Sequence, residues 1–311
     1  MKSTKQKILD YIQKKGEVTP KEISDFFSLG SVMVHRHLKK LQKENKIARK
    51  GQIPKVFYFY IKTDKESRVR ESLNFVKENF LDKFKEEKSN FWNIKKQKNV
   101  DFSFLLKKSA FFSSKIEGNS LDLNSFMNVF EIKKEKKKEA EEIYDLVKGY
   151  EFAKNHILTE SFFLKVHKII SKQLVSKKRQ GVYRKEPVGV FSGSGLEYVA
   201  IEPDLIKTEI SIFFSEIGKL LSQKMTKQEV CFYSIWIHLH FVLIHPFSDG
   251  NGRMARLLEK WFLAEKLDKK YWYLESEKYY WDNLNIYYKS LKLGQNYWVV
   301  DFKKAKKFFE R

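Results

Sequence analysis

The 311-residue sequence has a single cysteine, no internal repeats and no long apolar run. Cys231 has no partner for an intramolecular disulfide and lies in an apolar stretch, which favours a buried thiol in a reducing compartment. The N-terminus interleaves lysines with apolar residues, unlike a signal peptide. The most apolar stretch, residues 231–244, is too short to span a bilayer. We therefore predict a cytoplasmic protein with no membrane partner.

Acidic residues are also scarce. Lysine and arginine number 61 against 39 aspartates and glutamates, which gives a net charge of +22. Such an excess attracts polyanions such as nucleic acids, nucleotide phosphates or acidic proteins, although a lysine-rich proteome would produce the same balance. Hydrophobic residues make up 42% of the chain, enough for a packed core. The length fits either two domains or one large domain with an appendage.

Residues 1–62 predict a small unit with the pattern of a winged helix-turn-helix. Apolar periodicity indicates three helices followed by a turn and a two-stranded ribbon. The segments are a first helix around Ile8, Leu9 and Ile12, a helix over residues 20–27 with Thr19 as its N-cap, a helix over residues 31–43, and the β-prone run 56–61.

The same unit concentrates positive charge, with fifteen basic residues against five acidic ones. A basic recognition helix and wing would bring these groups to phosphates and groove edges of DNA. The candidate DNA contacts are Arg36, Lys39, Lys40 and Lys43 on the third helix and Lys55 at the wing. A winged helix used only for packing or dimerisation is the alternative.

The rest of the chain divides into a connector and a larger domain. Residues 63–98 are highly charged with apolar residues at helical intervals, which predicts an amphipathic connecting helix that serves as a hinge or a homodimer surface. Residues 99–311 are mostly helical by period. One interruption, residues 181–203, alternates β-branched residues around a Gly-Ser-Gly turn and predicts a β-hairpin.

The segment HPFSDGNGRMAR, residues 245–256, carries the chemistry. Its glycines permit a tight turn before a new helix that opens at Arg253, and free N–H groups at such a turn bind phosphates. Arg253 and Arg256 follow three residues apart and can hold further phosphate oxygens. Asp249 offers one hard oxygen ligand, which suits Mg²⁺ shared with a nucleotide. His245 precedes this cradle, where a neutral imidazole can accept a proton.

The order of these residues resembles the signature of the Fic/Doc family, H-P-F-x-[DE]-G-N-G-R-x-x-R, at every fixed position. The resemblance covers about residues 100–311: His238 and Phe241 match the family's H-x-x-F, and Gly181, Tyr183 and Arg184 match the segment before its target-binding hairpin, the flap. It implies a mainly α fold, namely a helical Fic-type core with a short β-hairpin flap, here behind a winged helix-turn-helix.

The resemblance also implies an activity, the transfer of AMP from ATP to a hydroxyl side chain of a target protein or of the enzyme itself. The implied roles are a catalytic base at His245, a Mg²⁺ ligand at Asp249, ATP phosphate contacts at Gly250, Asn251, Gly252, Arg253 and Arg256, and target contacts in the flap at Val188, Gly189 and Val190.

A second motif predicts inhibition. Residues Ser113, Glu117 and Gly118 resemble the family's inhibitory pattern [ST]-x-x-x-E-[GN], in which the glutamate pairs with the second arginine, here Arg256. A carboxylate there would compete with the terminal phosphate of ATP. Toward the C-terminus the match is looser, with Tyr287 and Asn296 as the adenine contacts.

The sequence thus predicts an autoinhibited protein adenylyltransferase, which can also remove AMP if Glu117 holds a water in place of the acceptor hydroxyl. Two alternatives stay open. One is a winged-helix transcriptional regulator whose Fic core senses a nucleotide. The other is an enzyme with a different donor, such as another nucleoside triphosphate or a phosphocholine-bearing nucleotide. The target protein and the DNA operator are not encoded in any pattern found.

Overall fold

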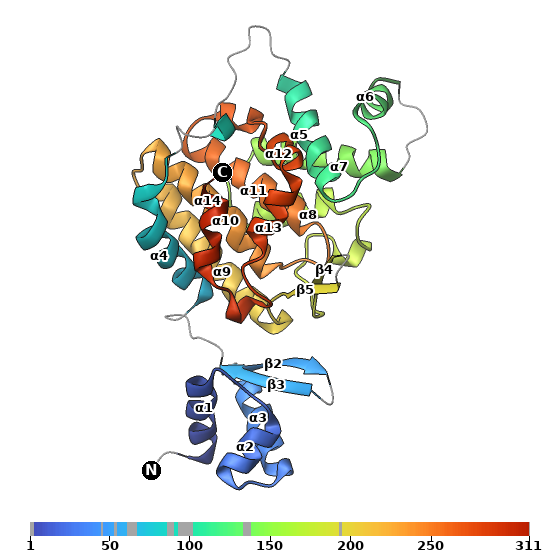
Figure 1. Cartoon of the computed structure of the whole chain (residues 1–311). Coiled ribbons are helices and arrows are strands. Elements are labelled where there is room, and N and C mark those ends of the chain that lie inside the picture. Colours follow the sequence, from blue (N-terminus) through green and yellow to red (C-terminus); the bar gives the residue numbers. More distant parts are fainter. Residues whose placement is uncertain are drawn as a thin grey trace. The chain divides into compact units, whose positions relative to one another are not determined.

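The computed structural model describes residues 3–44, 46–52, 55–60, 67–85, 90–92, 102–132, 138–192 and 195–310. The chain forms two compact units, Met1–Arg68 and Val69–Arg311. Both are mainly helical, as expected (Figure 1). Within the described residues, no helix is both long and apolar enough to traverse a membrane.

The first unit is a winged helix-turn-helix with three helices and a small antiparallel sheet (Figure 1). Thr19 caps the second helix together with Glu22 in a capping box, as the sequence indicated. The expected two-stranded ribbon is instead a three-stranded sheet of order β1-β3-β2, because the short segment after α1 pairs with β3. The elements are α1 Thr4–Lys15, β1 Glu17–Val18, α2 Pro20–Phe27, α3 Ser31–Lys43, β2 Ile47–Gln52 and β3 Lys55–Tyr60.

Only part of the expected connecting helix at residues 63–98 falls within the described residues. Helix α4, Arg68–Phe80, packs against the second unit instead of standing apart as a linker. The Ser72 hydroxyl contacts Nδ1 of His240 at 2.8 Å and accepts a hydrogen bond from Nε1 of Trp236 at 3.0 Å, and all three side chains are buried. The stretch after the winged helix therefore contributes to the core of the larger domain.

The second unit is a helical domain built around α10 and α11, which pack closely against each other through α10's almost wholly buried surface. Most of its remaining helices surround this pair, α6 lies at the periphery, and a hairpin of two strands lies at the edge of the domain (Figure 1). The helices are α5 Phe102–Ile116, α6 Leu123–Ile132, α7 Lys138–Lys154, α8 Glu160–Ile170, α9 Pro203–Ser222, α10 Lys227–Ile244, α11 Asn251–Lys266, α12 Ser276–Asp282, α13 Leu284–Leu291 and α14 Lys306–Phe309, and the strands are β4 Gly189–Ser192 and β5 Gly195–Val199.

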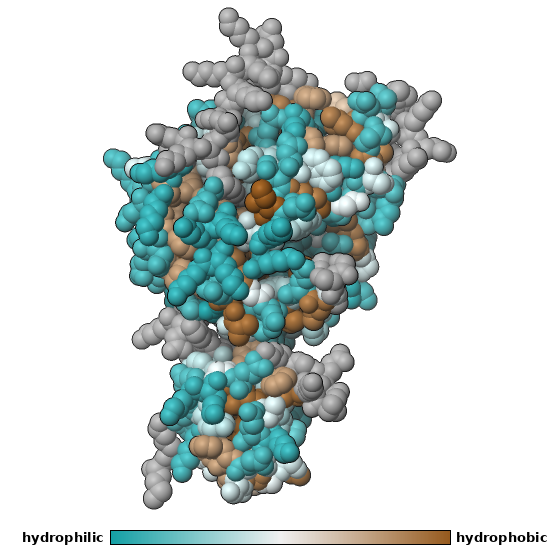
Figure 2. Space-filling model, viewed as in Figure 1, coloured by the Kyte–Doolittle hydropathy of each residue, from teal (hydrophilic) through white to brown (hydrophobic). Residues whose placement is uncertain are grey.

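The face of the molecule shown in Figure 2 is mostly hydrophilic, with scattered apolar spots. Exposed apolar side chains include Ile157, Ile286 and Val299, each more than half exposed. Isolated exposures of this kind are ordinary in folded proteins. The exposed apolar side chains therefore do not mark a binding surface.

Candidate active site

The turn between α10 and α11 holds the signature residues. His245 ends α10 with left-handed backbone angles, φ 50° and ψ 58°, which are unusual for a residue other than glycine and are held by the surrounding contacts. Arg184 supplies those contacts: its Nε donates to the His245 carbonyl at 2.8 Å, and its backbone N–H donates to the Pro246 carbonyl at 2.9 Å.

The imidazole of His245 is oriented by one hydrogen bond. Its Nδ1 lies 3.2 Å from the carbonyl oxygen of Val242, and because a carbonyl only accepts, Nδ1 carries the proton. The other ring nitrogen, Nε2, then has a free lone pair. Burial and, more weakly, the charge of Arg184 lower the pKa of His245 to about 4, although Val242 and Glu117 oppose this shift. The imidazole is therefore neutral at pH 7 and able to accept a proton.

The glycine turn differs in detail from the sequence expectation. Of the two glycines in this turn, Gly250 has positive φ and Gly252 does not. Helix α11 already begins at Asn251 instead of Arg253. The side chain of Asn251 braces the turn, since its Oδ1 accepts from the Phe247 N–H and its Nδ2 donates to the Phe247 carbonyl, each at 2.9 Å. The first N–H groups of α11 have no partner within the helix and mark an anion site.

Gly252 lies in this first turn of α11 and is covered by Glu117. A Cβ at this position would overlap with the Glu117 carboxylate, so only glycine allows an anionic group to approach the helix start so closely. The carboxylate thus occupies the place at which a phosphate could meet the N-terminus of α11.

Arg256 holds Glu117 in this place. Its Nη2 lies 2.6 Å from Oε1 of Glu117 and 3.0 Å from the carbonyl oxygen of Ser113, while its Nε donates to the Ser113 hydroxyl at 2.9 Å. Burial would raise the pKa of Glu117, but the charges of Arg256 and Arg253 outweigh burial and lower it. Glu117 is therefore an anion paired with a wholly buried guanidinium.

The inhibitory motif that the sequence singled out is thus brought together with Arg256 across more than a hundred residues. Ser113 is in the last turn of α5, and Glu117 and Gly118 follow the helix end. Gly118 has φ +87° and terminates the helix, so that Glu117 projects from its end.

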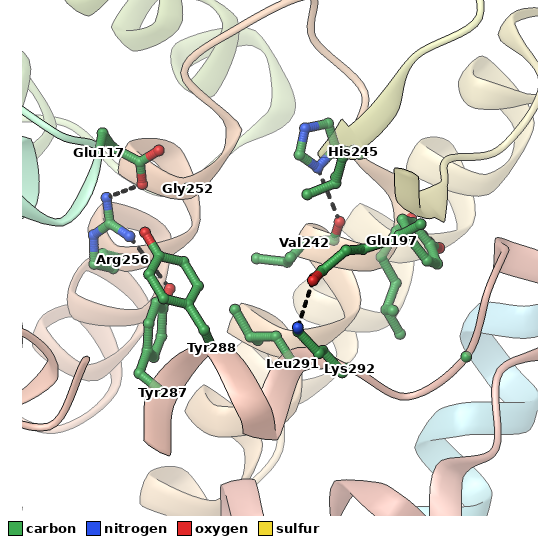
Figure 3. A pocket seen from close by; sticks show the side chains of 14 residues that line it. Glu117, Glu197, Val242, His245, Gly252, Arg256, Tyr287, Tyr288, Leu291 and Lys292 are labelled. Atoms are coloured by element: carbon green, nitrogen blue, oxygen red, sulfur yellow. Dashed lines mark hydrogen bonds and ion pairs between the residues drawn. The ribbon is translucent and has the colours of Figure 1, made fainter. Parts of the chain in front are cut away.

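Glu117 lines two cavities. The larger, about 540 Å³, lies between the flap, the end of α10 and α13 (Figure 3). Glu117 and Arg256 stand on one side of it and the ion pair between Glu197 and Lys292 on the other, with His245 beside the flap. It is lined by Glu117, Val190, Glu197, Tyr198, Val242, Leu243, His245, Gly252, Arg256, Tyr287, Tyr288, Leu291, Lys292 and Gly294.

The smaller cavity, about 230 Å³, contains the other polar signature residues and is lined by Glu117, Lys138, Glu142, Gln173, Leu174, Asp249 and Arg253. The spacing of the two arginines suggested that both hold the same phosphates. In the structure, Arg256 lines the larger cavity and Arg253 lines the smaller one.

The expected metal ligand, Asp249, is exposed and lines the smaller cavity, and its Oδ1 accepts from the Gly250 N–H at 2.5 Å. Among the residues that the structure describes, no group of three or more histidine, cysteine or acidic side chains could hold a metal by itself. The single carboxylate of Asp249 fits Mg²⁺, which commonly binds one protein carboxylate together with substrate phosphates and waters.

The flap is the expected hairpin, although its strands span only residues 189–199 of the predicted 181–203. Val190 lines the larger cavity, Gly189 opens β4, and the Val188 carbonyl accepts from the Ala200 N–H at 3.1 Å. The Tyr198 hydroxyl donates to the Leu243 carbonyl at 2.7 Å, which fixes the flap against α10.

The two candidate adenine contacts have other partners. Asn296 accepts hydrogen bonds from the N–H groups of Trp298 and Val299 and caps a short 3₁₀-helix, and it does not line the larger cavity. Tyr287 does line it, but its hydroxyl accepts from Nη1 of Arg256 at 3.2 Å. These other partners are consistent with the loose match of the sequence to the family pattern near the C-terminus.

Sequence reasoning missed His167 on α8. Its Nδ1 accepts from the Gly181 N–H at 2.9 Å, its Nε2 lies 3.1 Å from the Asp249 carbonyl, and its ring stacks on Phe247. Burial lowers the pKa of His167 to about 4. This side chain therefore ties the start of the flap segment to the signature turn. In the sequence it is one of several polar residues on an amphipathic helix, and no pattern marks it out.

Four of the five candidate DNA contacts lie together on α3, and the fifth, Lys55, begins β3. Arg36, Lys39, Lys40 and Lys43 are all exposed on α3, whose buried face is formed by Val34, Leu38 and Leu41. The side chain of Lys55 lies outside the described residues. Helix α3 therefore presents a basic outer face, as a recognition helix requires.

Comparison with known proteins agrees with this geometry. Residues 157–263 match the Fic/DOC family and residues 1–48 match a winged helix-turn-helix DNA-binding family. A Fido domain-containing protein of Dictyostelium discoideum is 36% identical over 78 residues, 25% of this chain and 50% of that protein. A probable protein adenylyltransferase of Aquifex aeolicus is 28% identical over 127 residues, 40% of this chain and 36% of that protein. The chain thus matches half or less of the length of these relatives.

Solved structures show the same fold. A Fic domain-containing signaling protein from Bacteroides thetaiotaomicron has a TM-score of 0.51 at 20% identity, covering 78% of this chain and 90% of that one. A Fic family protein from Desulfovibrio desulfuricans has a TM-score of 0.53 at 21% identity, covering 81% and 74%. The match to the Fic/DOC family thus covers residues 157–263 of this chain, and the match to a winged helix-turn-helix DNA-binding family covers residues 1–48.

Proposed function

We propose that the protein is an adenylyltransferase that moves AMP from ATP to a hydroxyl side chain of a protein, and that Glu117 inhibits it. The observation that carries this proposal is the position of the Glu117 carboxylate, over Gly252 and on Arg256, where a donor phosphate would bind. The name of the Aquifex aeolicus relative supports the same reaction class.

The reaction uses His245 and Arg256 on the wall of the larger cavity and Asp249 on the wall of the smaller one. Nε2 of His245 takes the proton of the acceptor hydroxyl while the hydroxyl oxygen attacks the α-phosphorus of ATP. The bond between the α-phosphorus and the oxygen that bridges it to the β-phosphorus breaks, and pyrophosphate leaves. Arg256 and the start of α11 stabilise the charge on the phosphates. Mg²⁺, held by Asp249 and the donor, would neutralise part of that charge. The flap would align the acceptor segment as an added strand.

Glu117 opposes this arrangement in two ways. It places a negative charge where the phosphates must lie, and it occupies a donor of Arg256 that they need. The same carboxylate could hold a water in line with a modified side chain, so removal of AMP is the reverse activity that this site would support.

The test is label transfer from ATP labelled at the α or at the γ phosphate, with Mg²⁺, for the wild type, Glu117→Gly and Glu117→Gly/His245→Ala. We expect protein-bound α label, on the enzyme or on lysate proteins, that is strongest in Glu117→Gly and absent from the double variant. Label from the γ position alone would mean phosphoryl transfer. No label from either, in variants that still bind ATP, would overturn the proposal in favour of another donor.

A second function rests on a separate observation, the basic outer face of α3 in a unit that matches a winged helix-turn-helix DNA-binding family. We propose that this unit binds DNA, so that the protein acts as a regulator whose Fic domain responds to a nucleotide. The two functions are compatible, because the residues invoked for each lie in different units.

A further inference from the structure

The smaller cavity has an unusual balance of charge for a site that is to receive a polyphosphate. Its lining contains three carboxylates, Glu117, Glu142 and Asp249, against two cations, Lys138 and Arg253. A bare nucleotide tail that carries several negative charges would be repelled by this excess of carboxylates. Removal of Glu117 alone leaves two carboxylates against two cations.

Glu142 on α7 contributes directly to this excess of carboxylates, because it pairs with Arg253 and offsets the charge of that guanidinium. Its Oε2 lies 3.0 Å from Nη2 of Arg253, and the two side chains are only 15% and 6% exposed. In such a poorly solvated place, the charge of one carboxylate is felt strongly by a neighbouring anion.

Arg253 nevertheless keeps donors for a ligand. Its Nε is buried and has no partner among the described residues, whereas Arg256 uses Nε, Nη1 and Nη2 on Ser113, Tyr287 and Glu117. Glu142 therefore binds the guanidinium through Nη2 and leaves Nε without a hydrogen-bond partner among the described residues. Because Arg253 also lines the smaller cavity, its guanidinium can meet a ligand there while Glu142 stays paired with Nη2.

We infer that Glu142 makes the site selective for the magnesium complex of the nucleotide over the metal-free nucleotide. This inference rests on the proposed function, since it assumes that the donor is a nucleoside triphosphate. The charge of Glu142, opposite Asp249 in the same cavity, penalises a bare polyphosphate, while the two positive charges of the bound cation cancel that penalty.

The substitution Glu142→Gln separates charge from orientation. The amide oxygen can still accept a hydrogen bond from Nη2 of Arg253, so the guanidinium keeps its position, but the negative charge is gone. The control is Glu151→Gln, the same change at an exposed position of α7 that does not line the cavity.

The experiment is calorimetric binding of α,β-methylene-ATP, whose α–β link cannot be cleaved by adenylyl transfer, to full-length Glu117→Gly with and without Glu142→Gln. Each titration is run with Mg²⁺ and with EDTA. We expect Glu142→Gln to tighten metal-free binding about tenfold while the affinity for the magnesium complex changes less than threefold. Glu151→Gln should change neither.

The outcomes are distinguishable. Equal metal-free affinity with and without Glu142→Gln, or weaker binding of both forms, would overturn the inference, the latter by showing that the charge of Glu142 is needed to orient Arg253. Loss of affinity for the magnesium complex alone would also overturn it, because Glu142 would then bind the metal. Absence of any binding to Glu117→Gly would instead contradict the proposed nucleotide site.

Discussion

The hydroxyl of Tyr287 lies 3.2 Å from Nη1 of Arg256, on the side of the guanidinium away from its bond to Glu117 through Nη2. Tyr287 is in turn held by Nε2 of His238 at 3.0 Å, and Nδ1 of His238 contacts the carboxylate of Glu259. All of these side chains except Glu117 are buried. Arg256 therefore has fixed partners that would remain if Glu117 moved away.

This arrangement predicts that the Tyr287 hydroxyl positions Arg256. In a Glu117→Gly background, we expect Tyr287→Phe to lower kcat/KM for ATP about tenfold, because Arg256 loses an acceptor worth roughly 1.5 kcal/mol. Steady-state transfer with ATP and GTP would measure it. If the hydroxyl contacted adenine, the ratio between the two nucleotides would shift; we expect that ratio to stay unchanged. Tyr273→Phe, whose hydroxyl contacts Lys154 and which does not line the larger cavity, is the control.

The low pKa of His245 predicts the pH dependence of transfer. The base works when neutral, and with a pKa of about 4 it is neutral throughout the physiological range. In Glu117→Gly, kcat/KM should therefore be level through pH 6.5 and fall only as the pH approaches about 4. Rates measured from pH 4.5 to 8 check this. An acidic limb centred near 6.5, the ordinary histidine value, would show that the nitrogen is not desolvated as the structure indicates.

His167 predicts a pH-dependent stability. Its pKa is about 4 in the folded protein and ordinarily 6.5, so between these values the unfolded chain binds a proton that the folded protein does not. The contribution of His167 to the free energy of unfolding is therefore complete above pH 6.5. As the pH falls toward 4, the free energy of unfolding decreases by up to about 3 kcal/mol. Urea unfolding of the wild type and His167→Gln at pH 7.5 and 4.5 tests this. We expect the difference between the two proteins to shrink at the lower pH, and a constant difference would refute it.

The α3 surface predicts salt-sensitive DNA binding. Neutralising Arg36, Lys39 and Lys40 with glutamine should weaken binding to sheared genomic DNA. The slope of log K against log salt should fall by about 0.9 for each DNA phosphate that the variant no longer neutralises. Fluorescence anisotropy over a salt series measures this slope. The matched control changes Lys303, Lys304 and Lys306, exposed lysines at the opposite end of the chain.

An unchanged slope in the α3 variant would exclude that helix as the DNA-binding element. His245→Ala should bind DNA as the wild type does, because it alters the other unit.

The sequence alone determined the features that are local in the chain. Apolar period and the Thr19 capping signal located α2 and α3 to the residue, since helix ends depend on nearby side chains. The β1 strand was missed because two residues become a strand only when β3 lies beside them. The order of residues 245–256 also sufficed to predict the signature turn and its neutral histidine.

What the tertiary structure decided is which groups face one another. Arg253 and Arg256 are three residues apart, yet packing turns them to different cavities, with Glu142 on one and Glu117 on the other. Glu117 could be matched to Arg256 from a motif, but Glu142 and His167 sit on helices with no distinguishing pattern. Their partners are brought near only by the packing of α7 and α8 against the signature turn, and the charge that a phosphate meets there is a sum over elements distant in sequence.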